Sequence, residues 1–206
     1  MTPDYWQEAC DELAKRDRVM KALIKKHPVA NLRNRGNAFS TLARAIVGQQ
    51  ISVKAAQSVW DRFAKAVGAM KPENVLKRDD QTLRDCGLSW KKVEYVKDLA
   101  AHFADGRINP RRWVREDDQT IIDELAAVKG IGRWTAEMFL IFYLLRPNVL
   151  PVDDIGLLRG TEKLYFKLEK KLTRKEMQEF GERWAPWCTV ATWYLWRALE
   201  PVPVEY

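Results

Sequence analysis

Apolar residues repeat at helical spacing along most of this chain. The clearest stripe runs from Phe39 to Val47 at positions i, i+3, i+4, i+7 and i+8, and predicts an amphipathic helix that ends near Gly48. Similar stripes predict further helices over Trp6–Leu13, Val19–Ile24, Ala56–Val67, Val93–Phe103, Ile121–Val128, Trp134–Leu145 and Pro186–Leu199. No stretch shows the period of two that is typical of a strand. The pattern therefore predicts an all-α fold of about nine or ten helices with short loops.

Residues that favour helix N-termini stand at several of the predicted helix starts. Their side chains can accept hydrogen bonds from the first backbone N–H groups, which have no partner within the helix. The predicted caps are Thr2 followed by Pro3, Asp17, Ser52, Ser89, Asp117 or Asp118, and Thr173 with Glu176 as a capping box.

The composition is that of a folded, basic protein. Of 206 residues, 47% are hydrophobic, which is enough for a core, and 35 Lys and Arg against 28 Asp and Glu give a formal charge of +7. This balance favours a polyanionic partner. Cys10, Cys86 and Cys188 are widely spaced and form no C-x-x-C pair, which argues against a zinc or iron–sulfur site and for a reducing compartment.

The chain shows no pattern of a secretion signal or a membrane span. Its first residues, Met1 to Asp4, have no basic stretch followed by an apolar run. The longest apolar run, Met138 to Leu145, is far shorter than the ~20 residues that a membrane helix needs. We therefore expect a cytoplasmic protein without membrane contact, associated with the nucleoid if it is bacterial.

The most informative segment is residues 128–136, Val-Lys-Gly-Ile-Gly-Arg-Trp-Thr-Ala. Gly130 and Gly132 stand between two helical patterns, and glycine permits a left-handed backbone and the close approach of a second chain. The N-terminus of the following helix favours an anion, and Lys129 and Arg133 add positive charge. We expect a phosphate of nucleic acid here. The simpler alternative is a corner between two helices with glycine as the C-cap.

A pair of acids follows this hairpin in Pro151-Val152-Asp153-Asp154. Aspartate is a favoured N-cap and suits the positive end of a helix, so capping alone can explain it. A carboxylate that faces DNA is electrostatically costly, however, and needs a reason to be there. The two acids are therefore candidates for chemistry on a nucleic acid.

Four segments along the chain resemble those of the helix-hairpin-helix DNA glycosylases. Residues 130–136 match the hairpin of that family, and residues 151–154 match the Pro-rich turn and aspartate that follow it. Residues 45–52 and 183–196 resemble the alkylation-repair branch, the 3-methyladenine DNA glycosylase II type. The resemblance covers nearly the whole chain.

This resemblance implies a single all-α HhH-GPD glycosylase domain over residues 1–206, with two lobes, no N-terminal β domain and no iron–sulfur cluster. The central lobe would span residues 37–148 with the hairpin at 128–136. The second lobe would combine residues 1–36 and 149–206, and the cleft between the lobes would hold the reacting groups. No cofactor or metal ligand is implied, although hairpin carbonyls could hold a structural monovalent cation.

The resemblance also implies excision of alkylated purines, of the 3-methyladenine and 7-methylguanine type, from double-stranded DNA in base excision repair. Asp154 takes the catalytic position, where it would stabilise an oxocarbenium-like transition state and orient or deprotonate water. Asp153 is the alternative. Family members that also cut the strand carry a lysine at the position of Trp134, and tryptophan cannot attack C1′. A monofunctional hydrolase without AP lyase activity is therefore expected.

The resemblance places Trp134, Trp196 and Met138 around the base pocket. The attraction between an indole face and a cationic base contributes ~0.5–2 kcal/mol. Stacking also holds a flipped base without requiring a specific set of hydrogen bonds. Met138 lies one turn after Trp134 and would form a flexible wall. Related enzymes often have an aromatic residue there, so Met138 departs from their pattern.

DNA contacts are expected at two places. Gln50, with Gln49 as the nearest alternative, matches the wedge that fills the gap left by a flipped nucleotide. The hairpin residues expected at the phosphate are Lys129, Gly130, Gly132, Arg133 and Thr135. His27 and His102 are isolated, which favours surface or capping roles over a metal site.

Two other functions fit parts of the pattern. A non-enzymatic helix-hairpin-helix DNA-binding protein would use the glycine turn and the positive charge, but not Asp154 or a tryptophan pocket. A glycosylase for uracil or mismatched bases would share the chemistry, although no amide or acid is evident for specific pairing. We expect a monomer without an obligate protein partner, because one cleft would engage the DNA.

Overall fold

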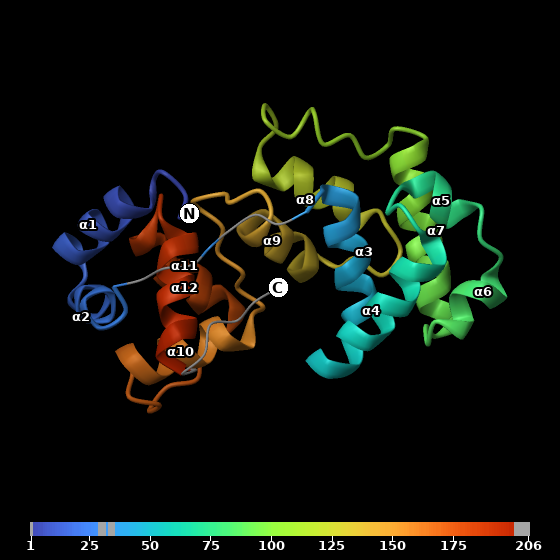
Figure 1. Cartoon of the computed structure of the whole chain (residues 1–206). Helices are drawn as coiled ribbons and strands as arrows, with labels where there is room; N and C mark the ends of the chain where they lie inside the picture. Colours follow the sequence, from blue (N-terminus) through green and yellow to red (C-terminus); the bar gives the residue numbers. More distant parts are fainter. Residues whose placement is uncertain (1, 29–31, 33–35, 200–206) are drawn as a thin grey trace. The chain divides into compact units, whose positions relative to one another are not determined.

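The computed structural model describes residues 2–28, 32 and 36–199, and every regular element among them is helical, as the sequence predicts (Figure 1). The elements are α1 (Trp6–Arg16), α2 (Arg18–Lys26), α3 (Ala38–Gly48), α4 (Val53–Val67), α5 (Pro72–Leu76), α6 (Asp80–Asp85), α7 (Trp90–Ala104), α8 (Asp118–Ala126), α9 (Arg133–Phe142), α10 (Ile155–Tyr165), α11 (Arg174–Gly181), the 3-10 helix η1 (Glu182–Trp184) and α12 (Cys188–Leu199). The sequence pattern missed α5 and α6, because such short helices show no stripe.

Local sequence explains where most of the helices begin. The caps confirmed by a side-chain hydrogen bond to the first turn are Asp17, Ser52, Ser89, Asp117 and the Thr173–Glu176 box. Three predicted ends are wrong: the N-cap of α1 is Tyr5 rather than Thr2, α12 begins at Cys188 rather than Pro186, and α9 ends at Phe142 rather than Leu145. The Trp6 N–H donates to the Pro3 carbonyl at 3.0 Å, so Pro3 belongs to a turn before the helix.

The chain forms two compact units. Unit 1 comprises Met1–Asn34 and Leu140–Tyr206, and unit 2 comprises Arg35–Phe139, so the chain passes between them within α9. In unit 2, α7 packs against α3, α5 and α6 (Figure 1). The rings of Phe39 and Phe103 meet edge to face there, with centroids 5.4 Å apart.

Helix α12 packs against α1, α2 and α10 in unit 1 (Figure 1). Trp6 of α1 meets Trp193 of α12 edge-on, with centroids 5.5 Å apart. The three cysteines of the chain are free and buried. Among the described residues, no helix is long and apolar enough to cross a membrane.

Candidate functional site

Asp154 caps the N-terminus of α10 and is only 8% exposed. Its Oδ1 accepts one hydrogen bond from the Leu157 N–H at 2.7 Å and another from the Trp196 indole N–H at 2.7 Å. These donors and the positive end of the helix offset the cost of removing a carboxylate from water. The capping role that the sequence allows is therefore present, together with a donor that no helix cap requires.

Trp196 comes this close to Asp154 because residue 156 is glycine. A Cβ at Gly156 would lie 2.9 Å from Nε1 of Trp196 and 3.0 Å from Oδ1 of Asp154, so an alanine would force the indole to move. The Trp196 ring also stacks on Phe142, with centroids 5.8 Å apart and planes 9° from parallel. Stacking and the hydrogen bond together orient the indole.

Asp153 has a different environment. Its carboxylate lies 3.3 Å from the Arg174 guanidinium, and the two side chains are 43% and 61% exposed. An exposed ion pair of this kind contributes little to stability. Of the two neighbouring acids, Asp154 is therefore the buried one with fixed donors, and Asp153 lies at the surface.

The hairpin between α8 and α9 uses its two glycines differently. Gly130 has a φ of +82°, a left-handed conformation that costs other residues about 1–2 kcal/mol. A Cβ at Gly130 would also overlap the Tyr95 ring. At Gly132, by contrast, no atom lies within 4 Å of the place that a Cβ would take. The fold therefore requires glycine at the first position, while the second faces open space.

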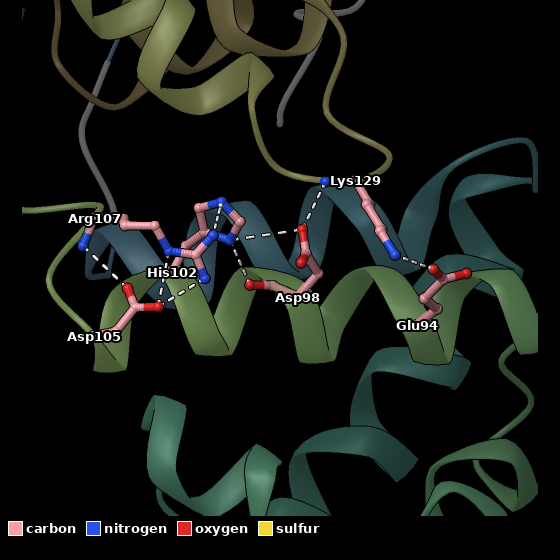
Figure 2. A network of polar contacts seen from close by, with 6 residues as sticks. All are labelled: Glu94, Asp98, His102, Asp105, Arg107 and Lys129. Carbon is pink, nitrogen blue, oxygen red and sulfur yellow. Dashed lines mark hydrogen bonds and ion pairs between the residues drawn. The ribbon is translucent and has the colours of Figure 1, made fainter.

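Helix α7 holds the hairpin through Lys129 (Figure 2). The backbone N–H of Lys129 donates to Oδ2 of Asp98 at 2.8 Å, and its Nζ lies 2.5 Å from Oε1 of Glu94. The Glu94 carboxylate raises the pKa of Lys129 above its ordinary value. The ammonium that we expected at a phosphate is thus paired with an acid of α7.

The same network continues along α7 to His102 (Figure 2). Because a guanidinium can only donate, Nε2 of His102 accepts from Arg107 at 2.8 Å, and Nδ1 donates to the Asp98 carbonyl oxygen at 2.9 Å. His102 therefore supports the helix residue that holds the hairpin. Glu94 and Asp98 are not among the residues that the sequence motifs predict for the site. Their spacing of four shows that they share a helix face, but not that the hairpin meets this face.

The start of α9 holds two further hairpin candidates. Arg133 donates from Nε to Oε1 of Glu137 at 2.9 Å and from Nη1 to Oε1 of Gln119 at 3.0 Å. Thr135 is half-buried. The guanidinium of Arg133 is therefore held by α8 and α9, beside the open space at Gly132.

The predicted pocket residues are divided between the units. Trp134 and Met138 lie in α9 within unit 2, and Trp196 lies in α12 within unit 1. Trp134 is 38% exposed, whereas Met138 is 6% exposed. Trp134 therefore has the accessible ring, and Met138 is mostly covered by the protein.

The two wedge candidates also differ. Nε2 of Gln49 donates to the Gly130 carbonyl at 2.8 Å, which ties Gln49 to the hairpin. Gln50 is exposed and has a φ of +58°. Gln50 is therefore the member of the pair that is available at the surface.

The sequence profile of the HhH-GPD superfamily of base excision DNA repair proteins matches residues 43–186, a stretch that contains both the hairpin and Asp154. The chain belongs to this superfamily. This HhH-GPD protein is similar to a DNA-3-methyladenine glycosidase from Bacillus halodurans, known from a crystal structure. The two are 38% identical with a TM-score of 0.83, and the match covers 90% of this chain and 86% of the other.

The protein is also similar to the 3-methyladenine DNA glycosylase Mag1 of Schizosaccharomyces pombe, solved in complex with abasic DNA. The identity is 33%, the TM-score 0.76, and the coverage 92% of this chain and 95% of that one. DNA-3-methyladenine glycosylase 1 of the same yeast is 35% identical over 163 residues, 77% of this chain and 71% of its own length. These likenesses confirm the family and its 3-methyladenine branch. Within the described residues, no group of three or more His, Cys, Asp or Glu could hold a metal ion.

Proposed function

We propose that this HhH-GPD protein is a monofunctional DNA glycosylase that excises flipped alkylated purines from double-stranded DNA. The observation that carries the proposal is the likeness to proteins named 3-methyladenine glycosylases, one of them bound to abasic DNA. Abasic DNA is what remains once a glycosylase has removed a base. The buried aspartate at the start of α10 supplies a group that such a reaction needs.

Asp154 is the proposed catalytic residue. The bond between the base nitrogen and C1′ breaks with its electron pair leaving on the base, while the sugar gains oxocarbenium character. A carboxylate near C1′ stabilises this positive charge, orients the water that adds to C1′ and accepts the proton that this water loses. A base methylated at N3 or N7 is cationic, so it leaves as a neutral purine.

The two donors on Oδ1 support this role for Asp154. The Leu157 N–H and the Trp196 indole N–H hold the carboxylate in one orientation. A group fixed in this way reorganises little as positive charge develops in the substrate, which is the main source of electrostatic catalysis.

Trp134 supports the monofunctional assignment. Lyase-competent members of the family carry a lysine at this position, which attacks C1′, and an indole has no comparable nucleophile. The product would be an intact strand with an abasic site. Trp134, Met138 and Trp196 remain the proposed pocket residues, and an indole face favours a cationic purine.

We propose that unit 2 contacts the DNA at the hairpin and at Gln50. The open space at Gly132 and the helix start at Arg133 suit a phosphate. Gln50 would fill the gap left by the flipped base. The remaining proposed contacts are Gln49, Lys129, Gly130 and Thr135. One such surface engages one lesion, which suits a monomer.

Base release from methylated duplex DNA tests this proposal. Freed 3-methyladenine and 7-methylguanine are separated by chromatography for wild type, Asp154→Asn and Asp153→Asn. We expect release by the wild type, release at least ~100-fold slower by Asp154→Asn, and a near-wild-type rate for Asp153→Asn. Asp153 is the matched control because it is the neighbouring acid in an exposed ion pair.

The possible outcomes separate the alternatives. Equal rates for wild type and Asp154→Asn would remove Asp154 from the mechanism. No release by a wild type that binds duplex DNA would favour a binding protein without enzymatic activity, and release of uracil or mismatched bases alone would favour a different substrate class. Strand cleavage, or a covalent complex trapped by borohydride, would contradict the monofunctional assignment.

A further inference from the structure

Lys92 of α7 binds the carboxyl end of α3. Its Nζ donates to the carbonyl oxygens of Val47 and Gln49, each at 2.7 Å. The last carbonyls of a helix have no partner within it, and α3 has no basic residue in its own last turn. A cation at this end also complements the helix dipole. Lys92 therefore caps the C-terminus of α3 from a neighbouring helix. Burial lowers the pKa of Lys92.

Gln49 connects this capped end of α3 to the hairpin. Its backbone carbonyl accepts from Lys92, while its side-chain amide donates to the Gly130 carbonyl at 2.8 Å. The next residue, Gln50, is exposed in a left-handed conformation that costs a non-glycine residue about 1–2 kcal/mol. Such a conformation persists where its surroundings fix it, and here both the backbone and the side chain of the preceding residue are held.

Helix α7 carries both attachments. Lys92 holds the loop after α3, and Asp98, further along the same helix, accepts from the Lys129 N–H of the hairpin at 2.8 Å (Figure 2). Loop and hairpin are thus bound to one helix and, through Gln49, to each other. All of these contacts lie within unit 2.

We infer that Lys92 and Gln49 form a brace that fixes Gln50 relative to the hairpin, and that Lys92 is a positioning residue for base flipping. This inference rests on the proposed function, in which the hairpin holds a phosphate and Gln50 enters the duplex. The phosphate then sets where Gln50 enters. Without the brace, the loop has more conformations and Gln50 is placed less often in the gap.

Lys92→Met and Lys91→Met form a matched pair. Each variant removes one positive charge, and the two positions are neighbours in α7. Lys91 is exposed, whereas Lys92 donates to two carbonyl oxygens. Gln49→Leu breaks the other half of the brace, and it keeps the test decisive if Lys92→Met does not fold. The double variant completes a cycle in which losses that share one brace are not additive.

Flipping is read from 2-aminopurine placed beside an abasic-site analogue in duplex DNA, and affinity from anisotropy with undamaged duplex. For Lys92→Met we expect affinity within about twofold of wild type. For both Lys92→Met and Gln49→Leu we expect a loss of about fivefold or more in the fluorescence change and in kcat for base release, each measured at saturating DNA. The double variant should lose little more than either single variant. Lys91→Met should match the wild type.

Hydrogen exchange of the amides in residues 47–52 gives a readout that needs no DNA. The brace predicts faster exchange in Lys92→Met and Gln49→Leu but not in Lys91→Met. Exchange at the wild-type rate in all three variants would overturn the brace. Faster exchange with unchanged flipping would overturn the positioning role. Failure of the proposed function shows separately, as no base release by the wild type, and exchange and flipping still decide the inference.

Discussion

The hydrogen bond from Trp196 to Asp154 joins two residues that lie 42 positions apart in the sequence. From the sequence, Asp154 is a candidate helix cap and catalytic acid, and Trp196 is a candidate pocket wall. In the fold, the indole N–H fixes the carboxylate, and Gly156 leaves the room that this contact needs. We therefore expect Trp196 to act on the reaction through Asp154.

Trp196→Phe isolates that contact, because it keeps an aromatic ring at Phe142 but removes the N–H donor. A hydrogen bond to a charged group contributes ~1.5–3 kcal/mol, so kcat for base release should fall about 10- to 100-fold while KM stays within about twofold. Trp187→Phe is the control, since the Trp187 indole donates to Glu12 at 2.7 Å in the same unit. A higher KM with unchanged kcat would assign Trp196 to base binding alone.

Among the structural elements, the hairpin depends on α7 as much as on its own sequence. The spacing Gly-x-Gly predicts a turn, but not that Tyr95 packs against the first glycine while the second faces open space. The two glycines thus differ: the fold requires the first, whereas the second faces open space, where we propose a phosphate. Alanine substitutions can separate these two roles.

Gly130→Ala should affect stability, whereas Gly132→Ala should affect DNA binding. Gly130→Ala adds left-handed strain of about 1–2 kcal/mol and a clash with Tyr95 of about 1–3 kcal/mol, so the free energy of unfolding in urea should fall markedly. Gly132→Ala should change it by less than ~0.5 kcal/mol but weaken DNA binding about tenfold, because its Cβ fills the open space. Strong binding by Gly132→Ala would show that no phosphate lies there.

At the scale of the whole molecule, the described phenol and thiol groups whose pKa burial raises are concentrated in unit 1. Burial raises the pKa of Tyr5, Tyr165 and Tyr194 above the ordinary value, and it raises the pKa of Cys188 from 9.0 to about 12. In each case the folded state disfavours the anion. The unfolded chain therefore releases these protons at a lower pH than the folded chain does.

Stability should consequently fall at alkaline pH. The contribution of Cys188 is fully present below pH 9.0 and is lost as the pH rises to about 12, and the tyrosines add to this loss above pH 10.0. The melting temperature, measured in steps from pH 8 to pH 12, should drop over this window. In Cys188→Ala the drop should be shallower, and an identical slope would refute the assignment to this thiol.

The helical stripes and caps were open to prediction because they depend on residues three or four positions apart. The Phe39–Val47 stripe, the Ser52 and Ser89 caps and the Thr173–Glu176 box all formed as expected. The predicted cap at Thr2 is wrong because Pro3 belongs to a turn that precedes α1.

By itself, then, the sequence determined an all-helical chain, a glycine hairpin and an acidic pair, and it pointed to the glycosylase family. Tertiary structure alone decided which side chains meet: Trp196 with Asp154, Asp98 with Lys129 across 31 positions, Lys92 with Val47 across 45, and Gln49 with Gly130 across 81. The physical reason is the distance along the sequence over which each kind of interaction acts. Helix signals are local hydrogen bonds and periodic burial, whereas the partners of a site are brought together by how the helices pack.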